Sequence, residues 1–448
     1  IQKGDLSPAK YYLLLLRLVY RILFLLVIEE RQLIYPEERD EELDKKRSIY
    51  YQFYSISRLT RLVEKFIYVD PRKTDLWCSL MVTFRIFESG TVGAKLGLLP
   101  LGSGLFSPAA LEVLVNQMLD NESLLRVLRH LVTFENDNQQ RVRVNYADLD
   151  VEEFGSVYEG LLEYDPEIKD INGQLVFSFV LGVERSSSGS HYTPEELVKP
   201  LLDHSLIHLI EEKLKADNPE QALLSLKVAD VACGSGHILL SAARRIGTEL
   251  ARIRTKEDQP APTALRLAIR DVIGHCIYGV DKNPMAVELC KVALWLEAHN
   301  PGQPLNFLDH KIKRGDAIVG LAHKEELLNG IPDEAFDRTT EDAASVASTL
   351  KKRNKEERKY RSQLNLDYAQ AEIEEPLDKI LKSYNEVMHL PETTPKEILE
   401  KEKAYQALIN SASWWRLKTL ADIQVAQFYL PKTEENYPLL VTDANYYD

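Results

Sequence analysis

The sequence is poor in cysteine, and this scarcity argues against two kinds of site. Its four cysteines show no Cys-X-X-Cys spacing and no accompanying histidine pattern; they are Cys78, Cys233, Cys276 and Cys290. This pattern disfavours a structural zinc site and a disulfide framework, and it fits a reducing cytosol. We therefore expect no bound metal and no disulfide, and we expect the protein to be cytoplasmic.

A surplus of positive charge is also missing. Asp and Glu number 69 against 55 for Lys and Arg, which gives a formal net charge of −14. Proteins that bind DNA through their overall charge are basic, so contact with DNA would have to come from local stretches or from other domains. We interpret the basic stretch KKRNKEERKYR at 351–361 as a solvated helical face in preference to a DNA contact.

The sequence also lacks a convincing membrane span or signal peptide. Residues 11–28 read YYLLLLRLVYRILFLLVI and are nearly long enough to cross a bilayer. Arg17 and Arg21 fall in the middle of this run, one helical turn apart, where two charges cost several kcal/mol in lipid. A buried helix with a basic stripe is the preferred interpretation, and no small-residue cleavage site follows it.

Length and composition fit a soluble protein of two or three domains. The chain has 448 residues, of which 45% are hydrophobic and 28% charged, values typical of globular proteins. It begins with Ile1 rather than Met, so we expect the start of the natural protein to be missing.

Hydrophobic periodicity predicts helices through the first part of the chain. The expected helices cover residues 13–34, 50–68, 108–131 and 149–164, with an irregular Gly- and Pro-rich loop at 90–108. Asn121 is expected to act as a cap within the third of these helices. A flexible linker, ERSSSGS at 184–190, follows.

Beyond the linker, short apolar strands alternate with helices. Strands are expected at 226–231 and 276–280, with helices at 238–254 and 264–274 between them. Asn283 is expected to cap the next helix, with Pro284 at its first position. Strands that alternate with helices predict a parallel, doubly wound sheet.

A glycine-rich turn follows the first of these strands. Residues 230–236 read DVACGSG, and parallel sheets bind ligands at the carboxyl ends of their strands, where glycines allow a close approach. Leu239 stands where a nicotinamide fingerprint requires a third glycine, and no Walker lysine is present. The alternative is a tight turn with no ligand.

Three further segments place polar groups near this turn. Asp281 ends the next strand, where a carboxylate can accept hydrogen bonds from ribose hydroxyls; the alternative is that it only caps the helix at Asn283. Thr193 and Glu196 form an expected capping box around Pro194. Asp316, in KRGDA at 313–317, adds a carboxylate after a third apolar stretch.

In their order, these four segments resemble the gamma-order adenine-specific DNA methyltransferases of the Eco57I-like restriction–modification branch. That family has (Y)YTP, DPACGSGH, GVDxNPxAVEL and GD segments, and this chain has HYTPEEL, DVACGSGHIL, GVDKNPMAVELCKVALWLEA and KRGDAIVG. The segments LLLLRLVYRILFLLVIEERQL, SISRLTRL and EEFGSVYEGLLE also look like parts of its large members. The resemblance covers most of residues 11–336.

The resemblance implies S-adenosylmethionine as cofactor and assigns its site. The residues for the methionine end are Asp230, Ala232, Gly234 and Gly236, with Cys233 in the same loop. Those that would close over that end are Tyr192, Thr193 and Pro194. Those for the rest of the cofactor are Asp281 at the ribose, Asn283 and Pro284 beside the adenine, and Asp316 near the adenine amino group. Val231 replaces the family's proline, so we expect a slightly looser turn.

The family's catalytic motif, Asn or Asp followed by Pro-Pro and Tyr or Phe, does not occur in these residues. Each Asn-Pro pair, at 218, 283 and 300, lacks a second proline. In the family this motif holds the flipped adenine for in-line attack on the methyl group. No catalytic residue is therefore assigned, and the chain alone is expected to be inactive. A cytosine C5 enzyme would need a Pro-Cys nucleophile, and no cysteine here follows a proline.

These observations predict an α/β protein that carries part of a Rossmann-like S-adenosylmethionine-dependent methyltransferase sheet. The expected domains are a helical one at 1–185, the cofactor-binding part at 186–325 and a charged helical insertion at 326–448. The full-length protein is expected to methylate adenine N6 in double-stranded DNA, in restriction–modification or phage defence, with other defence subunits as partners and no membrane. The alternatives are a fused endonuclease–methyltransferase of type IIG, an RNA or protein methyltransferase, and a non-enzymatic scaffold.

Overall fold

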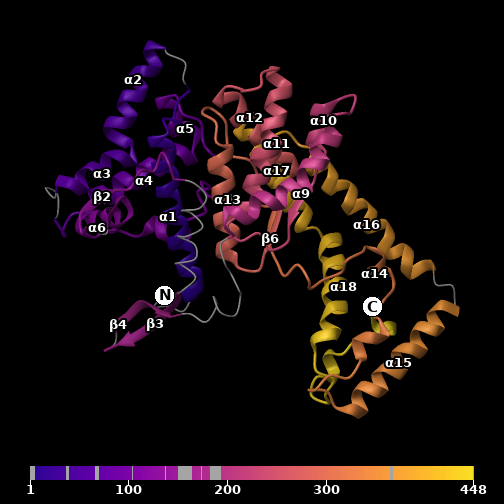
Figure 1. The fold of residues 1–448 in the computed structure, drawn as a ribbon. Coiled ribbons are helices and arrows are strands. Elements are labelled where there is room, and N and C mark those ends of the chain that lie inside the picture. Colours follow the sequence, from indigo (N-terminus) through magenta and orange to yellow (C-terminus); the bar gives the residue numbers. More distant parts are fainter. Residues whose placement is uncertain are drawn as a thin grey trace. The chain divides into compact units, whose positions relative to one another are not determined.

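The computed structural model shows a mixed α/β protein that is mostly helical and contains a small parallel sheet (Figure 1). It describes residues 6–36, 40–65, 70–102, 104–136, 138–149, 164–172, 174–181, 193–363 and 367–446. The contacts divide the chain into two compact units. The first comprises residues 1–315 and 392–399, and the second residues 316–391 and 400–448. Each unit has a hydrophobic core of its own.

The first helix, α1 (Pro8–Glu30), is a core helix of the first unit. It is long and apolar enough to cross a membrane, and 67% of its most apolar window is buried inside the protein. Arg17 pairs with Glu288 at 3.0 Å. Arg21 is fully buried, pairs with Glu88, and donates to the carbonyls of residues 105 and 107. Both arginines are thus satisfied by protein groups, as the core-helix interpretation requires.

The remaining helices around α1 differ in detail from those expected. They are α2 (Glu41–Ile49), the π-helix η1 (Tyr50–Tyr54), α3 (Ile56–Lys65), α4 (Asp75–Glu88), α5 (Gly90–Gly93), η2 (Ala94–Leu96), η3 (Glu112–Asn116) and α6 (Asn121–Val132). The expected helix at 50–68 is interrupted at Ser55, because the buried Glu29 carboxylate accepts the amides of Ile56 and Ser57. The expected cap at Asn121 is wrong, since Asp120 caps α6 through the Ser123 amide.

Two antiparallel hairpins lie within residues 1–185, where the sequence predicted a helical domain and no strand. Strand β1 (Thr133–Glu135) pairs with β2 (Arg141–Arg143), and β3 (Tyr164–Ile171) pairs with β4 (Gln174–Leu181). The second hairpin packs on α1 through edge-to-face contacts of Phe177 with Tyr11 and Phe179 with Tyr12. The helix expected at 149–164 falls almost entirely outside the described residues.

The parallel sheet has the strand order β5–β6–β7. Its strands are β5 (Val228–Asp230), β6 (Ile277–Asp281) and β7 (Ile312–Arg314), with Asp230 opposite Gly279 and Asp281 opposite Arg314. Helices α9 (Glu195–Lys213) and α10 (Pro219–Leu224) precede it, α11 (His237–Thr255) and α12 (Pro262–Cys276) connect β5 to β6, and α13 (Pro284–Ala298) connects β6 to β7. Both expected strands and the parallel pairing are confirmed.

The second unit is helical in the residues that the structure describes. Its elements are α14 (Glu325–Leu328), η4 (Asp333–Phe336), α15 (Ala344–Gln363), α16 (Asp367–Met388), the larger part of α17 (Pro395–Ile409), α18 (Ala412–Tyr429), η5 (Tyr437–Leu439) and η6 (Asp443–Asn445). The basic stretch 351–361 lies on α15, where Arg353 pairs with Glu357 and Arg361 with Asp443. These ion pairs within the protein favour the interpretation of the stretch as a helical face over its interpretation as a DNA contact.

Candidate functional site

The carboxyl ends of the three parallel strands meet at one edge of the sheet. Strand β5 ends at Asp230 and β6 at Asp281. Backbone bonds connect the turns that follow them: the Cys233 amide donates to the Val280 carbonyl at 2.9 Å, and the Gly315 amide to the Asp281 carbonyl at 3.0 Å. The structure therefore brings the glycine turn and Asp281, which are about fifty residues apart in the sequence, to the same edge.

The glycine turn, residues 230–236, depends on two left-handed glycines. Gly234 has φ +52° and Gly236 has φ +92°, a region that side chains disfavour. A Cβ on Gly234 would meet nothing within 4 Å, whereas one on Gly236 would lie 2.7 Å from the Sγ of Cys290. Gly234 is thus needed for its backbone angle, and Gly236 for both its angle and the space it leaves.

The turn leads directly into α11, whose N-cap is Gly236. No side chain caps this helix, and the first amides of a helix lack partners within it. The partial positive charge at the start of a helix favours a negatively charged ligand group. The start of α11 is therefore suited to a carboxylate.

Asp281 connects the glycine turn to the start of α13. Its Oδ2 accepts the Gly234 amide at 2.9 Å, and its Oδ1 accepts the Asn283 amide at 2.8 Å. Asn283 in turn caps α13 through the Met285 amide, with Pro284 as the first helical residue. Each carboxylate oxygen has a second acceptor site, so Asp281 can shape both turns and still accept bonds from a ligand's hydroxyls.

Asp230 is a second carboxylate at this edge. Its Oδ1 accepts the Ala232 amide at 3.0 Å. Partial burial, followed by repulsion from the Asp281 carboxylate, raises the pKa of Asp230 above its ordinary value. Two acidic groups in a partly dehydrated setting favour a positively charged partner, such as a ligand ammonium group.

Asp230→Asn is expected to stabilise the ligand-free fold by about 0.5–1 kcal/mol near pH 7, because it removes a partly buried charge. The raised pKa means that the folded state retains a proton that the unfolded state releases. The parent's stability therefore falls as the pH rises from the ordinary pKa of 3.8 through the raised one, and the variant lacks this component. Urea unfolding at both ends of that window measures it, with the exposed Asp217→Asn as control. Equal losses of stability in parent and variant would contradict the prediction.

The segment before α9 reaches the glycine turn through a histidine that sequence reasoning missed. His237 follows Gly236 directly, is 7% exposed, and bonds through Nδ1 to the Thr193 carbonyl at 2.8 Å. Its Nε2 bonds to the Glu195 carboxylate at 2.9 Å. The sequence feature that could have identified His237 is its position directly after the glycine turn.

The expected capping box of Thr193 and Glu196 is wrong. Helix α9 starts at Glu195, and Pro194 itself occupies the N-cap position, with no side-chain cap. Thr193 lies one residue too early to cap, and its backbone carbonyl is engaged by His237 instead. Tyr192 lies outside the described residues.

Two other expected site residues have more limited structural support. Cys233 is buried; its carbonyl accepts the Gly236 amide at 2.7 Å, and its side chain packs beneath the turn against Gly279. Asp316 belongs to the second unit, where its Oδ1 accepts the Ile318 amide at 3.2 Å. A ligand contact by either residue stays a prediction.

The Cys290 thiol lies beside the turn and is protected from reaction. Cys290 is fully buried, and a hydrogen bond with Cys233, together with burial, raises its pKa well above the ordinary value. A thiol in this state is a poor nucleophile. Within the part of the chain that the structure describes, no three His, Cys, Asp or Glu side chains gather as a metal site would require.

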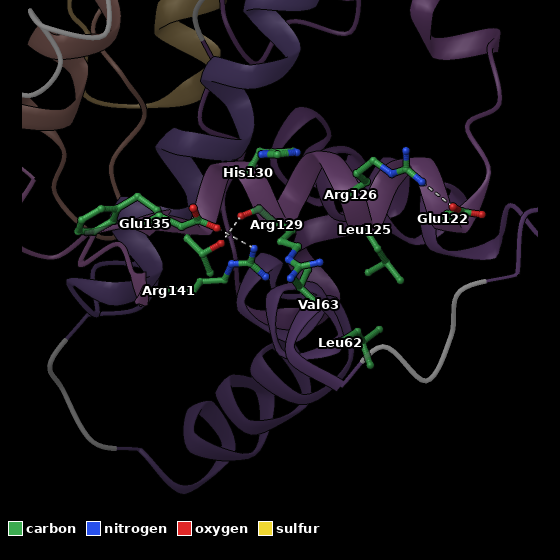
Figure 2. A pocket seen from close by; sticks show the side chains of 11 residues that line it. Leu62, Val63, Glu122, Leu125, Arg126, Arg129, His130, Glu135 and Arg141 are labelled. Atoms are coloured by element: carbon green, nitrogen blue, oxygen red, sulfur yellow. Dashed lines mark hydrogen bonds and ion pairs between the residues drawn. The ribbon is translucent and has the colours of Figure 1, made fainter. Parts of the chain in front are cut away.

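A cavity of about 680 Å³ lies elsewhere in the first unit, between α3, α6 and the β1–β2 hairpin (Figure 2). Its lining includes Arg129 and His130 and two ion pairs, Arg126 with Glu122 and Arg141 with Glu135. Figure 2 shows each of these two arginines directed at its acidic partner. None of the residues expected to bind a ligand lines this cavity.

Two families of known proteins match the chain. Residues 150–304 match the N-6 DNA Methylase family, and residues 275–403 match the Eco57I restriction-modification methylase family. Parts of the chain are similar to these two DNA methylase families. The resemblance seen in the motifs is thus confirmed, and both matches include Asp281, Asn283 and Pro284. The N-6 DNA methylases use S-adenosylmethionine as cofactor, and their substrate is DNA.

Part of the chain is distantly similar to a bacterial DNA methyltransferase. DNA methyltransferase A of Bacillus subtilis (strain 168) is 26% identical over 155 residues, which are 32% of this chain and 17% of that protein. The match thus spans about a sixth of that relative. No solved structure matches the chain.

Proposed function

We propose that residues 1–448 contain the S-adenosylmethionine-binding part of a site-specific DNA methyltransferase. The full-length protein would methylate adenine N6 in double-stranded DNA, in restriction–modification or phage defence. The observation that carries the proposal is Asp281, whose two oxygens hold the glycine turn and the start of α13 at the edge of a parallel sheet. We propose further that the parallel sheet β5–β6–β7 is part of a Rossmann-like methyltransferase sheet.

The residues at this edge fit the chemical groups of the cofactor. Asp230 matches the ammonium group, the start of α11 matches the carboxylate, and Asp281 matches the ribose hydroxyls. Gly234 leaves open space where a side chain would stand. When bound, S-adenosylmethionine supplies an activated methyl group on a sulfonium centre.

The other residues assigned to the site would act mainly as its walls. The side chain of Asn283 is engaged in capping α13, so Asn283 and Pro284 would shape the adenine wall through the position of that helix. Ala232 and Cys233 would contribute through the backbone of the turn, and Tyr192, Thr193 and Pro194 would close the methionine end. Asp316 would lie near the adenine amino group.

The organisation of the larger protein is part of the same proposal. We propose a mostly helical part with two hairpins at 1–185, the cofactor-binding part at 186–325 and a helical insertion at 326–448, in a cytoplasmic enzyme; the first part and most of the second belong to one compact unit. Double-stranded DNA is its substrate, and further defence subunits are its partners.

Residues 1–448 are expected to bind S-adenosylmethionine weakly and to transfer no methyl group to DNA by themselves. Positioning supplies much of the acceleration in a displacement reaction, and the Asn-Pro-Pro-aromatic motif that would position the adenine does not occur in these residues. Calorimetry with S-adenosylmethionine tests binding, and transfer of labelled methyl followed by nucleoside analysis tests the reaction.

Each result has a distinct consequence. N6-methyladenine formed by the full-length protein supports the proposed reaction, whereas N4-methylcytosine would overturn the adenine assignment. Robust N6-methyladenine formed by residues 1–448 would show that the target-binding residues lie within them. Absence of cofactor binding by the full-length protein would favour the scaffold alternative.

A further inference from the structure

The turn that would hold the cofactor is connected to the segment before α9 by one buried side chain. His237 is the first residue of α11, directly after Gly236. Thr193 lies 44 positions earlier in the sequence and 2.8 Å away, measured from its carbonyl oxygen to Nδ1 of His237. Glu195, the first residue of α9, meets Nε2 of the same ring at 2.9 Å.

We infer that His237 is a positioning residue that fixes the Thr193–Glu195 segment against the glycine turn and thereby sets cofactor affinity. This inference rests on the proposed function, in which the same segment closes over the methionine end of the cofactor. His237 is not assigned a catalytic role, because both of its ring nitrogens are engaged by protein groups and its side chain is 8% exposed.

The hydrogen-bond chemistry shows which of the two contacts is decisive. A backbone carbonyl can only accept, so Nδ1 of His237 must be the donor to Thr193. The Glu195 side chain is 53% exposed, so water can replace the ring as its partner, and the contact contributes little. The Thr193 bond is the contact that joins the segment to the buried ring, and losing a bond of this kind costs more.

The rigidity of α11 explains how one bond can matter for binding. The helix packs with Leu239, Leu240, Ala242 and Ala243 fully buried, so its first residue has a fixed position. The segment before α9 gains no side-chain cap of its own. The bond from His237 therefore helps to hold this segment against the turn, and a loose segment would have to be ordered when the cofactor binds, which lowers affinity.

The test uses three substitutions at one position in the 448-residue chain. His237→Ala removes both bonds and should weaken S-adenosylmethionine binding about tenfold. His237→Asn places an amide donor near the position of Nδ1 and should recover affinity to within about threefold of the parent. His237→Gln reaches toward Glu195 instead and should be about as weak as His237→Ala.

The control substitutions lie on the same helix, α9. His208→Ala removes an exposed histidine, and Glu196→Gln alters an exposed acid next to Glu195. Both should bind as the parent does, within about twofold, since neither makes the connection to the turn. Thermal unfolding of every variant checks that its fold is kept.

A second measurement separates this inference from the proposed function. The amides of Leu197 and Val198 bond to the Pro194 carbonyl in the first turn of α9. In the ligand-free chain, hydrogen exchange at these amides should be about tenfold faster in His237→Ala and close to the parent in His237→Asn.

The two measurements lead to separable conclusions. A parent that binds no S-adenosylmethionine contradicts the proposed function, while the exchange data still decide whether His237 fixes the segment. Equal cofactor affinity in His237→Ala and the parent overturns the inference. A higher cofactor affinity in His237→Gln than in His237→Asn overturns it too. Unchanged exchange at Leu197 and Val198 in His237→Ala overturns it as well.

Discussion

Gly236→Val is expected to abolish binding of S-adenosylmethionine, with an affinity loss of at least about 100-fold. The new Cβ would lie 2.7 Å from the Sγ of Cys290, a fully buried side chain with no room to withdraw. The backbone at this position has φ +92°, which a β-branched residue adopts only at a cost of about 1–2 kcal/mol. Both effects displace the turn that would receive the cofactor. Calorimetric titration measures the loss.

Two other glycines separate the effect of the clash from that of the backbone angle. Gly302 has φ +78°, and a Cβ added there would meet nothing within 4 Å, so Gly302→Val carries the angular strain without a clash and should bind normally. Gly234 lies in the turn at φ +52°, and a Cβ added there would also meet nothing within 4 Å. Gly234→Ala should therefore lower the affinity for S-adenosylmethionine about tenfold through backbone strain alone. Near-parental binding by Gly236→Val, with its helical content intact, would show that the turn does not form the cofactor pocket.

Asp281→Ala is expected to weaken cofactor binding by about 100-fold, which is about 2.7 kcal/mol. The substitution leaves the amides of Gly234 and Asn283 without their acceptor and removes the group proposed to hold the ribose. Hydrogen bonds to a charged acceptor contribute about 1.5–3 kcal/mol each, so the loss of one ligand bond accounts for this magnitude. Calorimetry on the parent and variant measures it.

Asp281→Asn separates the structural part of this effect from the part due to the ligand. Its amide oxygen retains one acceptor for the turn, so the fold should lose less stability than in Asp281→Ala, while cofactor affinity should still fall by about tenfold. Asp217→Ala, at an exposed position, is the control. If Asp281→Ala bound as tightly as the parent, the assignment of this carboxylate to the ribose would be wrong.

The sequence alone was sufficient for features that depend on neighbouring residues. The start of α13 at Asn283–Pro284 follows from a side chain that bonds two residues along and a proline pre-set for the first turn. Strands β5 and β6 followed from short apolar runs, and their parallel pairing followed from the helices between them. With that pairing, Asp230 and Asp281 had to reach the same edge of the sheet.

Other features were decided by contacts between distant parts of the chain. The interruption at Ser55 depends on Glu29, and the need for space at Gly236 depends on Cys290. Neither partner can be read from the local pattern around these positions. The two hairpins were missed for a related reason, since β3 and β4 gain support from α1, more than a hundred residues earlier.

His237 shows most clearly what only the tertiary structure determined. The sequence placed it beside the glycine turn and correctly started α9 near Pro194, but it assigned Thr193 to a local cap. The folded chain brings the Thr193 carbonyl to the buried ring instead. A local pattern specifies which groups can form hydrogen bonds, whereas the packing of α9 against α11 determines which partner lies within reach, because a bond requires the two atoms to be about 3 Å apart.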